Sequence, residues 1–310
     1  MKNRFGLSVA LATPVDENDA IAIDAMIELA KHCLKAGCAS VTLFGTTGEG
    51  CSVGTAERGK ALDALLEAGI SARHIVMGVL VDAVEDAACQ ARSALEKGVR
   101  NILLAPPSYF KGVSDDGVFN WYSCVFKALG RSARDIIVYN LPSVTMVPLS
   151  LDLIGRLKTA FPDIVVGVKD SSGDWSYTER LLAAHRDLII LVGDERHLAR
   201  AVRLGGQGAI SGMANFLPAE VRAMAVEGRD DGCVERFVEE LLKYPVVPAI
   251  KALVARQTGD RRWLAPRAPL VPLGPEACDA LESAYSALFQ SKAGSYGRQH
   301  DADDATRKGV

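Results

Sequence analysis

Lys169 is the residue with the clearest chemical signal in this chain. It closes the apolar run IVVGV (residues 164–168) and is followed at once by DSSG (170–173). β-Branched residues without polar alternation are typical of a strand buried on both faces. Burial disfavours the charged form of an amine, and a free amine attacks carbonyl carbons. A lysine at a strand end also commonly extends its ammonium to solvent, so its interpretation depends on what surrounds it.

Two other segments contain groups suited to the same chemistry. The turn GTTGEG (residues 45–50) places Thr46 and Thr47 between glycines. Backbone N–H groups and hydroxyls in such a turn can hold a carboxylate without a cation, although a plain glycine turn before a helix explains the same residues. Tyr139 ends the run DIIVY, and a phenol beside an attacking amine can move a proton while a carbinolamine becomes an imine.

The elements that must position these residues alternate along the chain. Strands are expected at residues 8–11, 40–44, 74–80, 101–104, 135–139, 164–168, 188–192 and 208–211, and helices at 21–36, 55–68, 84–97, 115–129, 149–159, 175–185 and 195–204. Alternating strands and helices favour parallel βα units. An open sheet that binds a dinucleotide would have G-x-G-x-x-G after its first strand, and none follows it here. The predicted fold is therefore an α/β (β/α)8 TIM barrel.

Active-site groups of such a barrel lie at the C-terminal ends of its strands, so other strand ends supply further candidates. The loop after the fourth strand presents Tyr109, and the seventh strand ends in Gly193, Asp194 and Glu195. Acids at a helix N-terminus either cap the helix or bind hydroxyls of a second substrate. The glycine-rich run before Ile210 on the eighth strand could also hold a phosphate, as barrel enzymes commonly do.

Beyond residue 215 the strand signal stops, and helices are expected at residues 219–226, 233–243, 247–257 and 276–289. We predict a barrel domain at residues 1–225 and a C-terminal helical extension at 226–292. The polar and charged segment 293–310 is expected to be a disordered tail.

Composition excludes several classes of partner. The chain has 310 residues, 49% of them hydrophobic and 24% charged, and a formal net charge of −3. This balance gives no basic field for nucleic acid or an anionic membrane. The sequence has no run of 18 apolar residues and no signal-peptide core at its N-terminus. Seven scattered cysteines without a C-x-x-C pair favour reduced, small buried thiols and a cytoplasmic location.

Four motifs together carry a resemblance to a known family. These are GTTGE (45–49), YN-x-P-x-x-T (139–145), G-x-KDSSG (167–173) and GG-x-G-x-IS (205–211). In this order and at this spacing they resemble the dihydrodipicolinate synthase/N-acetylneuraminate lyase family over roughly residues 5–290. The motifs are specific for the family as a whole and do not select one of its members.

The resemblance implies a class I aldolase or lyase that needs neither metal nor cofactor. Lys169 would form a Schiff base with C2 of pyruvate or a related 2-keto acid, and Tyr139 would relay protons. Thr46 and Thr47 would hold the carboxylate and link the proton chain. Tyr109 would reach the site of a neighbouring subunit in a homotetramer or homodimer. The candidate substrate-binding positions are Gly45, Gly48, Val144, Ser171, Gly193, Asp194, Glu195 and Ile210.

Val144 is a departure from the family pattern. Synthases that condense aspartate semialdehyde with pyruvate usually carry arginine at this position, and valine offers a second carboxylate no bidentate partner. A neutral or hydroxylated aldehyde, or a keto-deoxy sugar acid that is cleaved or dehydrated, fits valine better. The alternatives are 4-hydroxy-tetrahydrodipicolinate synthase proper and a non-catalytic keto-acid-binding paralogue. A metal-dependent aldolase is disfavoured because the five histidines form neither H-x-H nor H-x-x-x-H.

Overall fold

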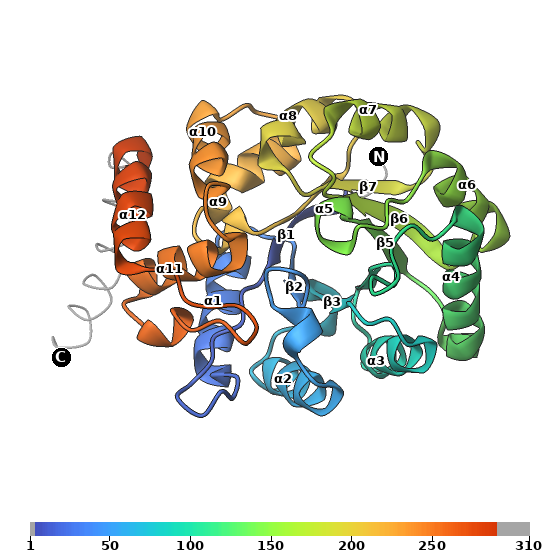
Figure 1. Ribbon diagram of the computed structural model, residues 1–310, viewed down its shortest axis with the longest axis horizontal. Coiled ribbons are helices and arrows are strands. Elements are labelled where there is room, and N and C mark those ends of the chain that lie inside the picture. The colour runs from blue at the N-terminus through green and yellow to red at the C-terminus, as the bar shows by residue number, and fades with distance from the viewer. Residues whose placement is uncertain (1–3, 290–310) are drawn as a thin grey trace, which may run out of the picture.

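The computed structural model describes residues 4–289, so the tail expected at 293–310 lies outside the described residues. Eight parallel strands form a closed barrel in the order of the chain, and helices surround it (Figure 1). The strands are β1 (Gly6–Ala10), β2 (Ser40–Leu43), β3 (Ile75–Val79), β4 (Asn101–Leu104), β5 (Ile136–Asn140), β6 (Val165–Asp170), β7 (Ile189–Val192) and β8 (Gly208–Ser211). The predicted TIM barrel is confirmed.

The helices around the barrel occupy the segments expected from periodicity. They are α1 (Ile23–Lys35), α2 (Thr55–Glu67), α3 (Val84–Glu96), α4 (Asp115–Leu129), α6 (Leu151–Ala160), α7 (Trp175–Ala184) and α8 (Glu195–Arg203). One further helix, α5 (Pro142–Thr145), was not expected, because a single turn is too short to show a helical period. Pro142 at its start favours this turn, since proline has no N–H to leave unpaired there.

Alternation along the strands separates two cores. Ile137, Tyr139, Leu191 and Ile210 belong to an apolar cluster inside the barrel. The intervening residues, such as Val138, belong to the larger cluster between the strands and the helices. Because successive side chains of a strand point to opposite faces, this arrangement turns Tyr139 toward the barrel interior.

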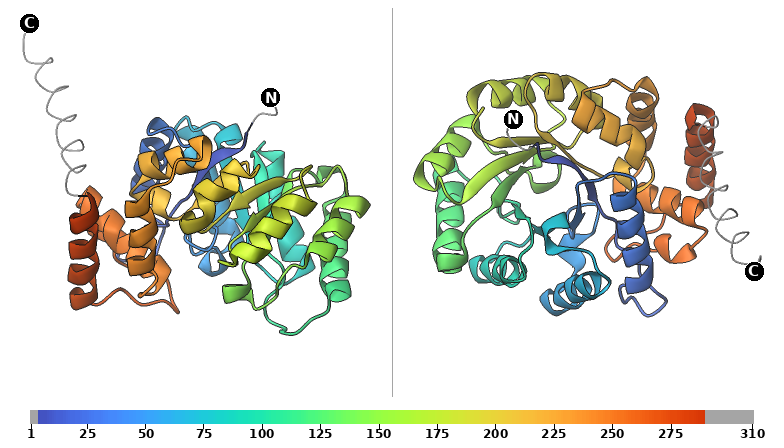
Figure 2. Two further views of the ribbon diagram at one scale, coloured as in Figure 1. Left: turned by 90° about the horizontal axis from the view of Figure 1, so that it is seen from above. Right: turned by 180° about the vertical axis from the view of Figure 1, so that it is seen from behind.

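The chain after β8 forms helices on one side of the barrel (Figure 2). They are α9 (Pro218–Arg222), which continues into the π-helix η5 (Ala223–Glu227), then α10 (Gly232–Leu241), α11 (Val246–Thr258) and α12 (Pro275–Phe289). Edge-on contacts join Phe237 of α10 to Tyr285 and Phe289 of α12. The predicted C-terminal helical extension is therefore present.

Two expectations drawn from composition can be compared with the structure. All seven cysteines are free thiols; Cys33 and Cys38 are buried as expected, whereas Cys51, Cys89 and Cys124 are exposed, contrary to the expectation of buried thiols. Cys89 lies on the exposed face of α3, Cys124 lies on the exposed face of α4, and Cys51 lies in the turn after β2. Between residues 4 and 289 no helix has the length and apolar character needed to cross a membrane.

Candidate active site

A cavity of about 330 Å³ opens at the C-terminal ends of the barrel strands. Ten of the thirteen residues singled out from the sequence line it: Thr46, Thr47, Tyr139, Val144, Lys169, Ser171, Gly193, Asp194, Glu195 and Ile210. The rest of the wall comes from the segments that follow β5, β6 and β8, from Arg196 of α8 and from the C-terminal extension. Residues that lie far apart in the sequence thus meet at the rim where a barrel enzyme holds its chemistry.

Lys169 and Tyr139 form the centre of this cavity. They are register partners on β6 and β5, so their side chains project from the same face of the sheet. The Lys169 Nζ donates to the Tyr139 Oη at 3.2 Å and lies 4.3 Å from the centroid of the phenol ring. Lys169 is only 5% exposed and Tyr139 is buried. The amine is therefore held at one place by a proton-carrying group.

Tyr139 also contacts the turn that follows β2. Its Oη lies 3.3 Å from the Thr46 Oγ1. Burial opposes ionisation of the phenol, but the Lys169 ammonium and hydrogen bonds from Thr46, Lys169 and Ser171 outweigh it and lower the pKa of Tyr139. A chain of hydrogen bonds consequently runs from the amine through the phenol to a threonine hydroxyl.

The next register pair fixes the ends of the two strands. The Asn140 Nδ2 donates to the Asp170 Oδ1 at 3.0 Å, and the Thr178 Oγ1 donates to the Asp170 Oδ2 at 2.6 Å. The Asn140 Oδ1 accepts from the Leu149 N. Each side-chain oxygen and nitrogen of Asn140 and Asp170 has a partner within the protein, which restricts the positions of Tyr139 and Lys169 beside them.

The GTTGEG turn has an unusual backbone. Phe44 and Glu49 both have φ of 55°, the left-handed region that non-glycine residues rarely adopt. A Cβ at Gly48 would lie 2.7 Å from the Leu11 carbonyl oxygen, and one at Gly50 or Gly78 would overlap the Phe44 carbonyl oxygen. Gly48 is therefore required by the turn itself, and the cavity wall here consists of the two threonines. Gly45 belongs to the same turn, where its carbonyl accepts from the Gly50 N.

Gly193 leaves space for the groups that do chemistry. A Cβ at this position would overlap the Ser171 Oγ and lie 3.2 Å from the Lys169 Cε. The glycine at the end of β7 is thus explained by the path of the Lys169 side chain across the barrel rim.

Asp194 caps a helix and also lines the cavity. Its carboxylate caps α8 by accepting from the Arg196 N, and it pairs with the Arg196 guanidinium through contacts of 3.0 and 2.7 Å. Burial opposes this ionisation, but the Arg196 contacts prevail and lower the pKa of Asp194. Asp194 also lines the cavity, so the helix cap forms part of the site wall.

Glu195 is the buried carboxyl of the site. Its Oε1 accepts a hydrogen bond from the Ser211 Oγ at the end of β8. Burial raises the pKa of Glu195 to about 7, although Ser211 and the Lys169 ammonium act in the opposite direction. Near neutral pH this carboxyl can therefore either donate or accept a proton.

Tyr109 lies away from the cavity of its own chain. It is 78% exposed on the loop after β4, where its ring meets that of Phe110 edge-on at 5.3 Å. The Asp82 carboxylate accepts from the Ser108 and Tyr109 backbone N–H groups, each at 2.8 Å, and so fixes the loop. Tyr109 therefore takes no part in the hydrogen-bond chain of Lys169, Tyr139 and Thr46 in its own cavity.

Sequence reasoning missed one cation and one wall of the cavity. The cation is Arg196; only the two acids before it, Asp194 and Glu195, were predicted as site residues. The wall is apolar and comes from the C-terminal extension: Val238, Leu241, Leu242, Val246 and Ile250. Apolar residues at helical spacing predict a helix that faces a core, and the pattern does not distinguish a core from a cavity wall. Only the proximity of α10 and α11 to the barrel rim reveals this second role.

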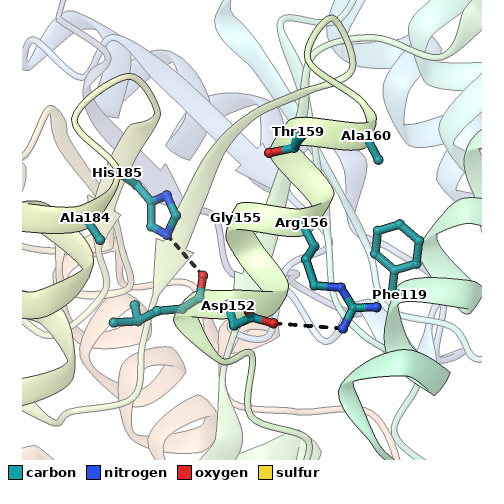
Figure 3. A pocket seen from close by; sticks show the side chains of 9 residues that line it. Phe119, Asp152, Gly155, Arg156, Thr159, Ala160, Ala184 and His185 are labelled. Carbon is teal, nitrogen blue, oxygen red and sulfur yellow. Dashed lines mark hydrogen bonds and ion pairs between the residues drawn. The ribbon is translucent and has the colours of Figure 1, made fainter.

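A larger hollow of about 800 Å³ lies on the outer surface between α4, α6 and α7 (Figure 3). Its Arg156, Asp152 and His185 side chains already have partners: Arg156 pairs with Asp116 and Asp152, and the His185 ring contacts the Leu151 carbonyl. None of the groups suited to carbonyl chemistry lines it. Among residues 4–289 no three or more His, Cys, Asp or Glu side chains gather as a metal site. The rim cavity is therefore the candidate active site.

Comparisons with known proteins show the family to which this chain belongs. A family described as the dihydrodipicolinate synthetase family matches residues 3–288. The chain belongs to the dihydrodipicolinate synthetase family. It is 33% identical over 260 residues to an uncharacterized DapA-like lyase of Chloroflexus aurantiacus, covering 82% of this chain and 86% of the relative. It is 27% identical to the 4-hydroxy-tetrahydrodipicolinate synthase of Thermus thermophilus, covering 87% and 92% of the two chains.

A solved structure extends the comparison. The crystal structure of dihydrodipicolinate synthase from Agrobacterium tumefaciens is 63% identical to this chain, with a TM-score of 0.91, and the match covers 92% of this chain and 100% of that one. Membership of the dihydrodipicolinate synthetase family supports a pyruvate-dependent lyase that acts through a Schiff base.

Proposed function

We propose that this protein is a class I aldolase or lyase that joins pyruvate, or a related 2-keto acid, to an aldehyde, or that cleaves such an addition product into the keto acid and the aldehyde. The observation that carries the proposal is the buried pair of Lys169 and Tyr139, whose Nζ and Oη lie 3.2 Å apart in the rim cavity. An amine beside a phenol supplies both the nucleophile and the proton carrier that imine formation requires.

The chemistry follows from these groups in order. The Lys169 amine adds to C2 of the keto acid, and the carbinolamine oxygen leaves as water after it takes a proton from Tyr139. The resulting iminium draws electrons from C3, which loses a proton to the Tyr139 phenolate and forms an enamine. The enamine attacks the aldehyde carbon while the aldehyde oxygen takes a proton from Tyr139, and water then hydrolyses the iminium to release the product and restore the Lys169 amine; the same steps run in reverse to cleave a product. Thr46 and Thr47 hold the keto-acid carboxylate through their hydroxyls and backbone N–H groups. The lysine and phenol carry each step without a cofactor.

The second substrate is best matched by a neutral or hydroxylated aldehyde; in the cleavage or dehydration direction the substrate is then a keto-deoxy sugar acid. Val144 on α5 is 59% exposed at the cavity mouth, where it offers a carboxylate no ion pair. Asp194, Glu195 and Ser171 line the same cavity and can bind hydroxyls. The guanidinium of Arg196 is already paired with Asp194. Charge and hydrogen-bonding capacity therefore favour a hydroxylated partner over a second anion.

The second candidate is the condensation carried out by 4-hydroxy-tetrahydrodipicolinate synthases. The name of the Thermus thermophilus relative and that of the Agrobacterium tumefaciens structure favour it. Val144 opposes it, because the arginine expected in those synthases would be the partner of the aldehyde's carboxylate.

We also propose that the protein works in the cytoplasm as a homodimer or homotetramer. The exposed ring pair of Tyr109 and Phe110 on a loop held by Asp82 supports this assembly. In such an oligomer Tyr109 would approach the site of a second copy.

Exchange of the pyruvate methyl protons tests the function without knowledge of the second substrate. Reversible enamine formation replaces these protons with deuterium in D₂O, which is followed by proton NMR. We expect exchange with the wild-type protein and none with Lys169→Ala; equal rates in both would contradict the proposal. A panel of hydroxylated aldehydes, keto-deoxy sugar acids and aspartate semialdehyde, assayed for pyruvate uptake or release, then separates the two candidates.

A further inference from the structure

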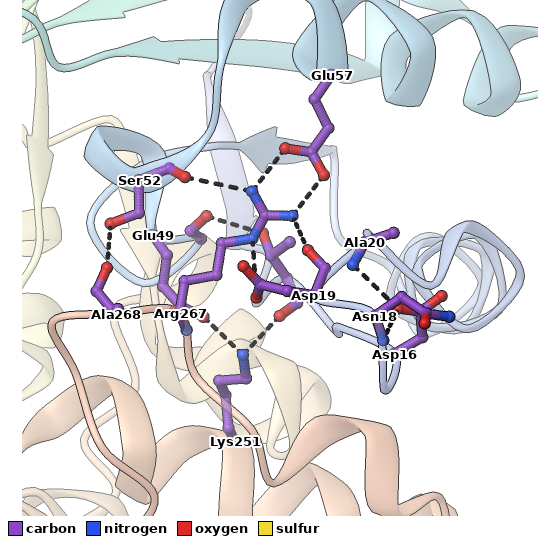
Figure 4. A network of polar contacts seen from close by, with 12 residues as sticks. Asp16, Asn18, Asp19, Ala20, Glu49, Ser52, Glu57, Lys251, Arg267 and Ala268 are labelled. Atoms are coloured by element: carbon purple, nitrogen blue, oxygen red, sulfur yellow. Dashed lines mark hydrogen bonds and ion pairs between the residues drawn. The ribbon is translucent and has the colours of Figure 1, made fainter.

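A buried ion pair connects the C-terminal extension to the turn that carries Thr46 and Thr47 (Figure 4). The Lys251 Nζ of α11 lies 2.6 Å from the Glu49 Oε1, across 202 residues of sequence. Lys251 is 0% exposed and Glu49 is 3% exposed. The same Nζ donates to the Thr13 carbonyl at 2.7 Å. The ammonium is therefore buried between two acceptors of the protein.

Arg267 engages the other oxygen of the same carboxylate. Its backbone N–H donates to the Glu49 Oε2, while its guanidinium pairs with Glu57 and donates to the Asp19 carbonyl at 2.7 Å (Figure 4). Both oxygens of Glu49 are consequently held by residues that follow the barrel. Glu49 itself cannot rotate without breaking contacts to two different segments.

Glu49 is directly coupled to the candidate carboxylate-binding turn. It lies two residues after Thr47, its N–H donates to the Thr46 carbonyl at 3.0 Å, and its φ is 55°. Such a backbone conformation persists only where the surrounding structure fixes it. The residue before Lys251 approaches the same place: a Cβ at Gly212 would lie 2.7 Å from the Ile250 Cδ1 and 3.2 Å from the Thr47 Oγ1.

An ion pair is a poor choice if stability alone is required. Two charges lose their hydration on burial, and an apolar pair of similar volume is often equally stable or more so. The ion pair instead fixes the orientation of the Glu49 side chain, because both of its carboxylate oxygens accept from donors that are themselves fixed. Burial lowers the pKa of Lys251, and the adjacent Glu49 carboxylate opposes that shift.

We infer that Lys251 and Arg267 are positioning residues for the keto-acid site: through Glu49 they fix the turn and aim the Thr46 and Thr47 hydroxyls into the cavity. This inference rests on the proposed function of that cavity. It assigns to the C-terminal extension a role in keto-acid binding that its sequence does not indicate.

The test compares Lys251→Met with Arg256→Met. Both residues lie on α11, and Arg256 pairs with Glu282 of α12 at 2.6 Å without contacting the turn. Two quantities are measured: amide hydrogen exchange of residues 44–50, and the pyruvate concentration that gives half-maximal exchange of its methyl protons. Lys251→Met should lose amide protection in residues 44–50 and raise that concentration about 10- to 100-fold. Arg256→Met should leave both quantities at their wild-type values.

Wild-type protection and wild-type pyruvate dependence in folded Lys251→Met would overturn the inference, as would equal losses in Arg256→Met. If Lys251→Met does not fold, the double variant Glu49→Gln/Lys251→Met removes both charges and leaves no unpaired buried carboxylate. The double variant should fold and show the same losses; wild-type behaviour, or failure to fold, would assign the pair to stability alone. If the wild-type protein exchanges no pyruvate protons, the proposed function fails, and amide exchange still decides whether Lys251 orders the turn.

Discussion

Lys169 and Tyr139 are register partners on adjacent strands, and their Nζ and Oη lie 3.2 Å apart inside the barrel. They stand 30 positions apart in the sequence, at the ends of two successive strands, so the pairing of β5 with β6 sets this distance. Because the partners share a face of the sheet, the amine and the phenol meet without help from a mobile loop. The proposed proton relay therefore joins two paired strands of the barrel.

Removal of the Tyr139 hydroxyl should slow proton transfer without unfolding the protein. We expect Tyr139→Phe to reduce pyruvate methyl exchange by about 10²- to 10⁴-fold, the usual contribution of a positioned acid–base group. Tyr122→Phe is the matched control, since this buried phenol of α4 donates only to the Leu104 carbonyl. The control should exchange pyruvate normally at a cost of about 1 kcal/mol in stability. Normal exchange by Tyr139→Phe would rule out the relay.

The absence of a side chain at Gly193 should be as important for pyruvate exchange as the reacting groups themselves. A methyl group there overlaps the Ser171 Oγ and crowds the Lys169 Cε, so Gly193→Ala should displace the amine and reduce methyl exchange about 100-fold. Gly59→Ala on α2 is the control, because a Cβ there meets nothing within 4 Å. It should stabilise α2 by about 0.5–1 kcal/mol and leave exchange unchanged. Equal activity in the two variants would show that Gly193 provides no needed space.

Much of this site could be predicted from the sequence because its residues stand at strand ends. β-Branched runs located β5 and β6, and the residue types at their ends indicated the chemistry of Tyr139 and Lys169. In a barrel every strand end faces one rim, so order along the chain was enough to bring these groups together.

The remaining features depend on contacts between distant segments. Glu49 belongs to the GTTGE motif and Lys251 to an expected helix, and nothing in the sequence indicates that folding brings the two together in the interior. Gly193 read as a possible substrate contact, whereas its position relative to Lys169 explains why it has no side chain. The apolar wall from α10 and α11 has the periodicity of any packed helix. The role of Tyr109 cannot be interpreted from one chain, since its exposed ring does not line its own cavity.

Glu195 should make stability fall as the pH rises. Burial raises its pKa from the usual 4.5 to about 7, so the folded protein binds this proton more tightly than the unfolded chain does. The resulting stabilisation is complete below about pH 4.5 and is lost as the pH rises through 7. Relative to Glu195→Gln, the wild-type free energy of unfolding should fall by about 3 kcal/mol between about pH 4.5 and about pH 8, measured by denaturant titration.

The exposed carboxyl of Glu96 on α3 provides a comparison for this measurement. Glu96→Gln should keep the wild-type pH dependence. A wild-type protein whose stability relative to Glu195→Gln is constant across this range would contradict the assignment of a raised pKa to Glu195.

A guanidinium at position 144 should change which aldehyde the enamine accepts. Val144→Arg should raise the rate with aspartate semialdehyde about 10- to 100-fold relative to a neutral aldehyde, as expected for a charge-assisted pair worth about 1.5–3 kcal/mol. Met146→Arg adds the same charge at an exposed position that does not line the cavity, and should change this ratio little. A wild-type protein that already condenses aspartate semialdehyde as fast as the neutral aldehydes would contradict the proposed substrate class.

Chemical trapping of the imine tests the central claim most directly. Borohydride reduction in the presence of pyruvate converts a lysine imine into a stable secondary amine, which intact-mass measurement detects and peptide mapping locates. We predict one reduced pyruvyl group per chain, located on Lys169, and no adduct in Lys169→Ala or in protein treated without pyruvate. An unmodified wild-type chain, or an undiminished adduct in Lys169→Ala, would contradict the account.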